Sequence, residues 1–192
     1  AFFAGRSWTP VAEPGCTGDI HSVAIDCVLV IDDNTENEGA MAYSFGVSAS
    51  GGSITAITTD GTDAGALIDG GFVQAELTSG EGNEGAVIGV LLSFNNPVTL
   101  PADGASTVAT VTVETAQPET AAASSVNLAF VDGLQGTGQP VAASITWQGT
   151  SWRPTLGTTS YAITSDVEAP AAPTGLDSAA WREMVTLDWD DN

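Results

Sequence analysis

The sequence predicts an all-β protein, an antiparallel β-sandwich or jelly roll of about eight or nine strands. Valine, isoleucine and threonine recur at alternating positions along most of the chain, which is typical of strands. Turns rich in Gly, Asn, Asp and Pro separate these segments, and long helical stretches rich in Glu, Lys and Leu are absent. A chain of 192 residues has room for one sandwich with extensions.

The N-terminal stretch, residues 1–19, is predicted to be an extended arm, because prolines interrupt it and no helical periodicity is present. The arm carries Phe2, Phe3 and Trp8. Such large aromatic side chains need to be buried, either on the protein's own sandwich or against a neighbouring molecule. These three residues are therefore candidate assembly residues.

The first core strand is predicted over residues 21–31, where apolar side chains occupy every second position and so share one face. Further strands are expected at residues 41–47, 53–59, 71–77, 86–94, 106–114, 125–131 and 141–149. The run AVIGVLLSF at 86–94 is almost continuously apolar, which predicts a central strand buried on both faces. Residues 62–70 are the one stretch with a helical alternative.

The chain is strongly acidic, since 24 Asp and Glu residues against 3 Lys and Arg residues give a formal net charge of −21. Nucleic acids and anionic membranes are polyanions, so neither is an expected partner. The charge suits cations, salty water or a basic partner, although it also serves solubility without marking a binding site. No apolar run approaches the roughly 18 residues that a membrane-spanning helix requires.

The two cysteines, Cys16 and Cys27, lie close together in the sequence. In a chain with secreted character a disulfide between them is expected, and closing so short a loop would stabilise the fold by roughly 2–3 kcal/mol. Two unpaired, buried thiols are the alternative. With His21 as the lone histidine, the cysteines do not complete a zinc ligand set.

The order of features along most of the chain supports a family resemblance. Residues 23–57 pair a strand with an aromatic-rich second strand, and residues 85–115 join two strands through a Pro-containing LP loop. Residues 125–149 place an Asp-Gly-Leu loop between two strands, and WRPTL at 152–156 follows as an exit. This order resembles bacterial cohesin-like domains, jelly rolls related to some carbohydrate-binding modules. The resemblance implies one such domain over residues 20–156, with a dockerin-like peptide or a polysaccharide as a partner.

The end of the chain resembles a second family. Residues 157–168 are predicted to be a linker. In residues 169–192 a Pro-rich entry precedes alternating Val185, Leu187 and Trp189, which resembles the first two strands of a fibronectin type III domain. Such a domain needs about 100 residues, so we expect that the natural protein continues or that a neighbouring copy orders this segment. Trp189 is therefore a further candidate assembly residue.

No catalytic constellation is recognisable, and we do not expect an enzyme. The sequence has one histidine and no nucleophile-elbow pattern. The Gly-rich GEGNEG at 80–85 lacks the lysine and the following helix of a phosphate-binding loop. A glycosidase, which needs only two carboxyl groups, is the enzyme class that the acidic composition leaves open.

The turn after the first core strand is a candidate calcium site, because Ca²⁺ prefers carboxylate and amide oxygens. The candidate ligands are Asp32, Asp33, Asn34, Glu36 and Glu38. Their spacing differs from that of an EF-hand loop, and a solvated acidic turn is the alternative. The turns at Asp60, Asp63 and Asp132 are second choices.

These features favour a non-catalytic module with a structural or adhesive role, secreted or at the cell surface. The aromatic arm and the incomplete β-structure at the other end are surfaces that another chain could complete by strand addition. A head-to-tail contact that does not close on itself builds a fibre or scaffold. The alternative is a recognition module for a dockerin-like peptide or a polysaccharide, in which Trp152 could stack on a sugar ring, whereas Trp147 alternates with Ile145 and is expected in the core.

Overall fold

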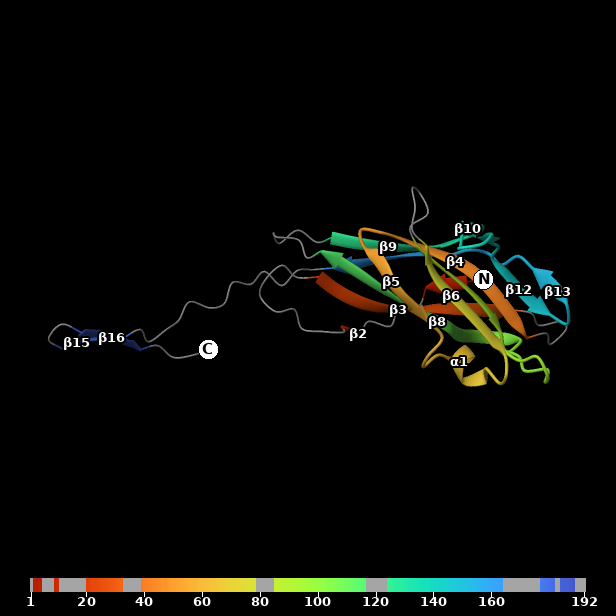
Figure 1. Ribbon diagram of the computed structural model, residues 1–192, viewed down its shortest axis with the longest axis horizontal. Coiled ribbons are helices and arrows are strands. Elements are labelled where there is room, and N and C mark those ends of the chain that lie inside the picture. The colour runs from red at the N-terminus through yellow and green to blue at the C-terminus, as the bar shows by residue number, and fades with distance from the viewer. Residues whose placement is uncertain are drawn as a thin grey trace.

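Two antiparallel β-sheets, packed face to face around a shared core, form the body of the protein (Figure 1). The computed structural model describes residues 2–4, 9–10, 20–32, 39–78, 85–116, 124–163, 177–181 and 184–188. Strands dominate these ranges, so the predicted all-β class is confirmed. The described residues contain a single short helix, α1 (Asp63–Leu67), within the stretch for which the sequence left a helix open.

The first sheet contains two short N-terminal strands, two long central strands and one edge strand. They are β1 (Phe2–Ala4), β2 (Thr9–Pro10), β3 (Ile20–Asp32), β5 (Ser53–Thr58) and β8 (Asp103–Ala116). The strand order is β1-β3-β8-β5, and β2 also pairs with β3. The arm predicted from the sequence thus places β1 and β2 along the edge of β3, opposite β5.

The second sheet is built around β4 (Ala42–Ser50). Its other strands are β6 (Phe72–Thr78), β7 (Gly85–Leu91), β9 (Ser124–Val131), β12 (Ser144–Trp147), β13 (Thr150–Trp152) and β14 (Thr158–Ile163). On one side β4 pairs with β7, which pairs with β6. On its other side β4 pairs with β12 along its first half and with β9 along its second half. β13 pairs with the outer edge of β12, and β14 pairs with the outer edge of β9. On the other side of β4, the sheet ends at β6.

Two small ribbons complete the described strands. β10 (Leu134–Gln135) pairs with β11 (Pro140–Val141), and this ribbon contacts β4 and β7. β15 (Asp177–Trp181) pairs with β16 (Met184–Asp188), and neither pairs with another strand of the described chain. This hairpin lies in the segment that resembles the start of a fibronectin type III domain.

The strands agree with the predicted ones in most places and differ near the predicted linker. Each predicted core strand overlaps a strand of the structure. Ala86, Val87 and Ile88 on β7 are at most 3% exposed, which confirms a central strand buried on both faces. β14 falls within residues 157–168, which the sequence analysis assigned to a linker. Pairing with β9 along all 6 residues supplies β14 with backbone hydrogen bonds that its sequence pattern did not signal.

A β-bulge in β8 keeps both halves of this long strand facing the core. The register with β3 pairs Cys27 with Ala109 and Val28 with Thr107, so Val108 is the extra residue. Val108 and Ala109 are both fully buried although they are adjacent in sequence. A regular strand would turn one of them to the outer face. The bulge therefore shifts the alternation of β8 by one residue at its middle.

The Tyr43 side chain connects the two sheets at this bulge. Tyr43 lies on β4, is 2% exposed, and donates a hydrogen bond of 2.6 Å from its hydroxyl to the carbonyl oxygen of Val108. A bulge locally disrupts the ladder, and the phenol hydroxyl gives the carbonyl of the extra residue a buried partner. The Phe45 ring lies 6.2 Å from the Tyr43 ring, and Phe130 meets Phe45 edge to face at 5.1 Å. Burial also raises the pKa of the Tyr43 phenol, so the phenol stays protonated as a donor.

We expect Tyr43→Phe to lower the free energy of unfolding by about 1–3 kcal/mol, because it leaves the Val108 carbonyl buried without its donor. Chemical denaturation of the two proteins measures the difference. Ser151→Ala is the matched control, since it removes an exposed hydroxyl that bonds only to Thr146 and should change stability by less than about 0.5 kcal/mol. Equal stability of Tyr43→Phe and the wild type would show that the inter-sheet bond does not stabilise the fold.

Candidate functional site

One side of the sandwich is open between β5 and β6, the edge strands of the two sheets. Among the described strands, β5 pairs with β8 alone and β6 pairs with β7 alone. β5 contacts β6 across the gap without pairing with it. On the opposite side of the sandwich, β1 contacts β9 and β14 of the second sheet. The N-terminal strand thus covers one side, whereas the other side presents two strand edges.

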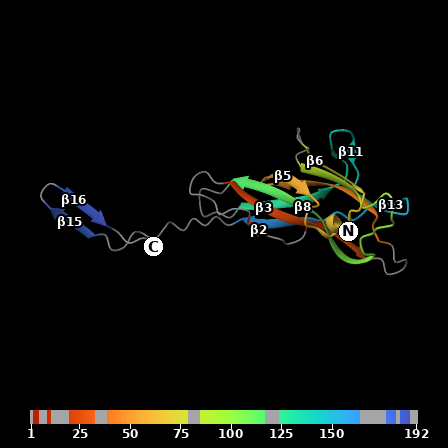
Figure 2. The same cartoon turned by 60° about the horizontal axis from the view of Figure 1, so that its bottom comes forward.

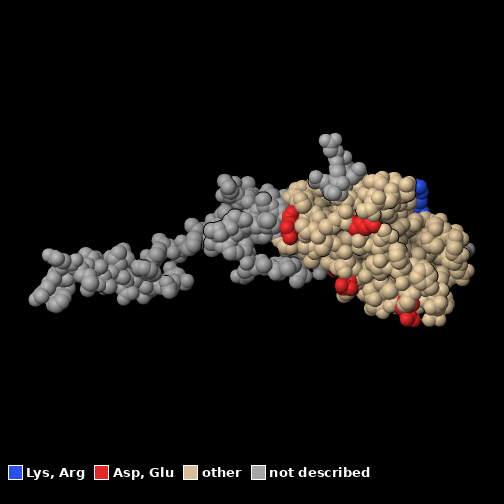
Figure 3. All heavy atoms as spheres, in the orientation of Figure 1, with Lys and Arg blue, Asp and Glu red and all other residues tan. Residues whose placement is uncertain are grey.

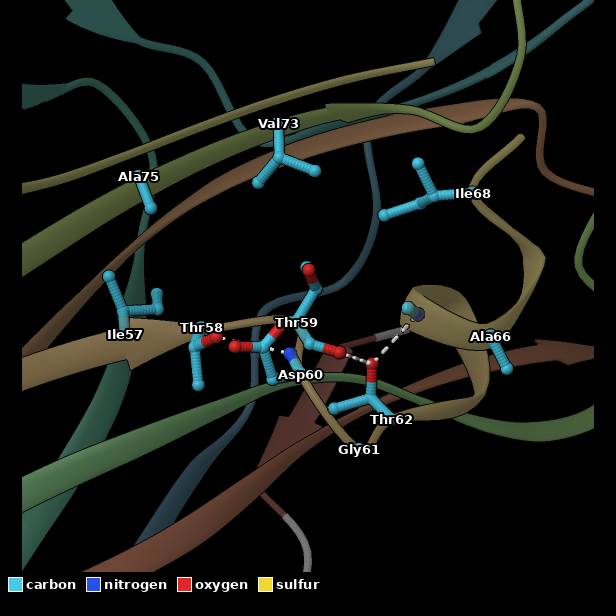
Figure 4. A pocket seen from close by; sticks show the side chains of 11 residues that line it. Ile57, Thr58, Thr59, Asp60, Gly61, Thr62, Ala66, Ile68, Val73 and Ala75 are labelled. Carbon is cyan, nitrogen blue, oxygen red and sulfur yellow. Dashed lines mark hydrogen bonds between the residues drawn. The ribbon is translucent and has the colours of Figure 1, made fainter. Parts of the chain in front are cut away.

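A hollow of about 700 Å³ lies between these strands, and we call it the edge cleft. Its apolar walls are Ile57 on β5, Ile68 after α1, and Val73 and Ala75 on β6. Figure 4 shows Ile68, Val73 and Ala75 above the turn at residues 58–62 and the start of α1, with Ile57 beside Thr58. The walls come from both sheets, so the cleft is an exposed continuation of the core.

The floor of the edge cleft is a turn that the sequence TTDGTDAG specifies. Thr62 is the N-cap of α1: its hydroxyl donates to the Thr59 carbonyl oxygen at 2.7 Å and accepts from the Gly65 backbone N–H at 3.0 Å. Gly61 adopts a φ of +75°, which favours glycine. A Cβ on Gly65 would lie 2.0 Å from the Thr59 carbonyl oxygen, so a larger residue could not approach β5 this closely. Two buried polar groups of the floor, the Thr62 hydroxyl and the Thr59 carbonyl oxygen, thus satisfy each other.

Asp63 fixes α1, and with it the floor of the edge cleft, to the first sheet. Its carboxylate accepts a hydrogen bond of 2.8 Å from the backbone N–H of Thr107 on β8. The pairing of β5 with β8 ends at Thr110, so β5 does not reach Thr107. The carboxylate takes the place that a longer β5 would occupy there.

The edge strand β6 carries an unusual amount of exposed apolar surface. Phe72, Val73 and Leu77 are 47%, 39% and 49% exposed. The register with β7 places Val73 and Leu77 opposite the core residues Val90 and Ala86, so they lie on the inner face of the sheet. Natural edge strands are commonly protected by charges, prolines or bulges. β6 has one charged residue and neither a proline nor a recorded register shift.

The outer face of β6 holds a loop, residues 136–141. The Glu76 carboxylate accepts hydrogen bonds from the Thr137 backbone N–H at 2.8 Å and from the Thr137 hydroxyl at 2.7 Å. The Gln74 side-chain amide donates to the same carboxylate. These bonds favour the charged form, so they lower the pKa of Glu76, and the Thr137 backbone N–H has the largest effect. A smaller hollow of about 280 Å³ lies under the loop, over Val87 and Gly89.

The edge cleft combines apolar walls with a polar floor. Its walls are aliphatic, Asp60 is its single ionisable residue, and the Thr58 and Thr62 hydroxyls of its floor are engaged within the turn. Within the ranges that the structure describes, no group of three or more His, Cys, Asp or Glu side chains could hold a metal ion. An aliphatic hollow beside two edges with which no described strand pairs fits an extended, partly apolar chain.

The predicted calcium ligands lie almost entirely outside the described residues. Asp32 ends β3, where only the backbone is described, and Asp33, Asn34, Glu36 and Glu38 lie outside. That site therefore stays a prediction. Of the second choices, Asp63 bonds to Thr107, and Asp132 accepts from the Ala143 backbone N–H at 2.9 Å and pairs with Arg153 at 2.6 Å. Both of these carboxylates are engaged in contacts that hold the fold.

Cys27 is a free thiol in the structure and is fully buried on the core face of β3. Burial raises the pKa of this thiol, and the neighbouring Asp26 carboxylate raises it further. Cys16 lies outside the described residues, so the predicted disulfide is neither seen nor excluded. A thiol that is both buried and protonated reacts slowly.

The predicted assembly residues are placed only in part. Phe2 and Phe3 belong to β1, which pairs with β3 of the same chain, while Trp8 and Trp189 lie outside the described residues. Trp147 is partly buried and Trp152 is 43% exposed. The sequence analysis recognised the alternation of β6 but not its edge position, because alternation does not reveal which strands have a neighbour.

Comparison with known proteins leaves the family open. No model of a protein family matches the sequence, and no curated protein matches it. The resemblances to cohesin-like and fibronectin type III domains therefore remain predictions. Within the part of the chain that the structure covers, no helix is long and apolar enough to cross a membrane.

We expect the bond between Glu76 and Thr137 to weaken in acid. Because the folded-state pKa of Glu76 lies below its unfolded value, the stabilising contribution is present above the unfolded pKa and is lost as pH falls through the folded pKa. Hydrogen exchange of the Thr137 amide, normalised to its intrinsic rate, should show protection at neutral pH that falls in acid. In Glu76→Gln, a neutral acceptor, this pH dependence should disappear. The same pH dependence in both proteins would contradict the assignment to Glu76.

We expect Cys27 to resist alkylation in the native protein at mildly alkaline pH and to react after unfolding without a reductant. Mass spectrometry of the peptide that contains Cys27 measures the labelling. If labelling of the unfolded chain requires prior reduction, Cys27 forms a disulfide and the sequence prediction is correct instead.

Proposed function

We propose that this protein is a non-catalytic structural or adhesive module, secreted or at the cell surface, that assembles with other chains by strand addition. The exposed apolar edge strand β6, which borders the edge cleft, is the observation that carries this proposal. A β-strand from another chain would supply hydrogen bonds to the free edge and cover the exposed side chains. The module would then be a subunit of an extracellular fibre or scaffold.

The contrast between the edge strands β5 and β6 supports β6 as the strand to which another chain adds. β5 contains a register shift between Ile54 and Ala56, and bulges of this kind discourage further strand pairing. The exposed side chains of β5 are small ones, Ser53, Thr55 and Ala56. β6 has a regular register with β7 over its whole length and exposes large apolar side chains instead.

The charge distribution also supports association through the sandwich. On the face shown in Figure 3, few charged atoms lie on the described body. β6 contains Glu76 as its single charge, and that carboxylate is already hydrogen-bonded to Thr137 and Gln74. The net charge of −21 would still oppose contact between copies at low ionic strength. We therefore expect salt to strengthen association.

A second candidate function, recognition of a polysaccharide, is favoured by the hairpin β12–β13. The register pairs Trp147 with Thr150 and Ile145 with Trp152, which puts both tryptophans on one face as diagonal neighbours. Ile145 on the same face packs against the core, whereas Trp152 is 43% exposed, and its ring can stack on a sugar. A chain that stays monomeric at every concentration and binds a polysaccharide would favour this function over the first.

The test of assembly is light scattering of the full chain over a range of concentration and salt. We expect the wild type to form species heavier than a monomer, and Leu77→Lys to weaken association by at least about tenfold, because the new charge would be buried in the joint. The lysine replaces a half-exposed side chain, so the variant should fold.

Phe94→Lys is the matched control, because Phe94 is 68% exposed and lies outside β6. This variant should assemble like the wild type. A wild-type chain that remains a monomer throughout would overturn the proposed function. Equal assembly of Leu77→Lys and the wild type would show that another surface makes the joint.

A further inference from the structure

We infer that the partner of β6 is β6 of a second copy of this chain, paired antiparallel about a two-fold axis at Ala75. The inference deepens the proposed function and rests on it. It joins the second sheets of two copies into one continuous sheet. Figure 2 shows β6 near the upper margin of the body.

The alternation of side chains restricts the register of such a pair. Antiparallel strands related by a two-fold axis present the same face of the sheet, so inner-face residues must lie opposite inner-face residues. The axis must then pass through a residue of β6. An axis at Ala75 pairs all 7 residues of the strand, which gives the largest number of cross-strand contacts.

The sequence of β6 is self-complementary about Ala75. In this register Val73 lies opposite Leu77 of the second copy, and Ala75 lies opposite its own equivalent. The two exposed aliphatic side chains on the inner face thus gain an apolar neighbour. Two small alanine side chains at the axis let the backbones approach without a clash.

The charge of Glu76 disfavours both neighbouring registers, in which the two-fold axis lies at Glu76 or at Gln74. An axis at Glu76 would place two carboxylates directly opposite each other, which is destabilising. An axis at Gln74 would put Glu76 opposite Phe72. In the register about Ala75, Glu76 lies opposite Gln74, and within one chain these two side chains already form a hydrogen bond. Across the interface between two copies, a Gln74 side-chain amide would therefore again face a Glu76 carboxylate.

The pairing of two β6 strands would also cover part of the apolar wall of the edge cleft. Val73 and Ala75 are both wall residues of the cleft and inner-face residues of β6. A second β6 extends that inner face sideways past the opening between β5 and β6, which removes apolar wall surface from water. A joint of one strand pair is small, so we expect association that depends on concentration rather than a permanent dimer.

Engineered cysteines on β6 test the register. Under mild oxidation of the full chain, Ala75→Cys should form a disulfide-linked dimer, because residues opposite each other have Cα atoms about 4.5–5.5 Å apart, within disulfide reach. Val73→Cys alone and Leu77→Cys alone should not, since each residue lies about 13 Å along the strand from its own equivalent. A mixture of Val73→Cys and Leu77→Cys chains should cross-link. The wild type is the blank for the native cysteines.

The outcomes distinguish a failure of the two-fold register from a failure of the proposed function. If the wild type assembles and Leu77→Lys does not, but Ala75→Cys fails to cross-link, strand addition stands and the two-fold register is overturned. Efficient cross-linking of Val73→Cys or Leu77→Cys alone would also overturn it. A wild type that never associates, with no cross-link in any variant, overturns both proposals.

Discussion

The hydrogen bond from the Tyr43 hydroxyl to the Val108 carbonyl is the contact on which the arrangement of the two sheets depends. It lies at the bulge where β8 changes its alternation, and it joins the centre of one sheet to the centre of the other. The bulge lets Val108 and Ala109 both face the core, so β3 and β8 stay paired along their full length without exposing an apolar half. A buried carbonyl without a donor at this position would be costly.

The same region of β8 determines where the sandwich is open. Because the pairing of β5 ends at Thr110, the backbone N–H of Thr107 is free to receive the Asp63 carboxylate. That bond places α1 beyond the end of β5, and the turn before α1 becomes the floor of the edge cleft. The cleft is thus a consequence of two strands of unequal length in the first sheet. Its partner wall, β6, belongs to the other sheet, so neither sheet alone forms the site.

The sequence predicts the strands well and the site poorly, for one physical reason. Alternation is a local property, and it located β3, β4 and β8, while an equally local apolar run located β7. Pairing is not local: the Tyr43 hydroxyl finds its acceptor 65 residues away, and no pattern around Tyr43 reveals it. The N-cap Thr62 followed by Asp63 was a readable signal for α1. The exposure of Leu77 could not be predicted from the sequence, because the alternating pattern of β6 is the same in an edge strand and in a central strand.

The acidic composition of the chain limits the surfaces at which two copies can meet, and β6 is one such surface. A net charge of −21 opposes unspecific contact between copies, and several described acidic residues, such as Asp60, Asp69 and Asp132, lie in turns rather than on the strands. An edge strand with a single, already bonded carboxylate is then a place where two copies can meet with little like-charge repulsion. Directional strand pairing needs such a place, because backbone hydrogen bonds act only at close range. The net negative charge would therefore restrict the proposed assembly to the β6 edge.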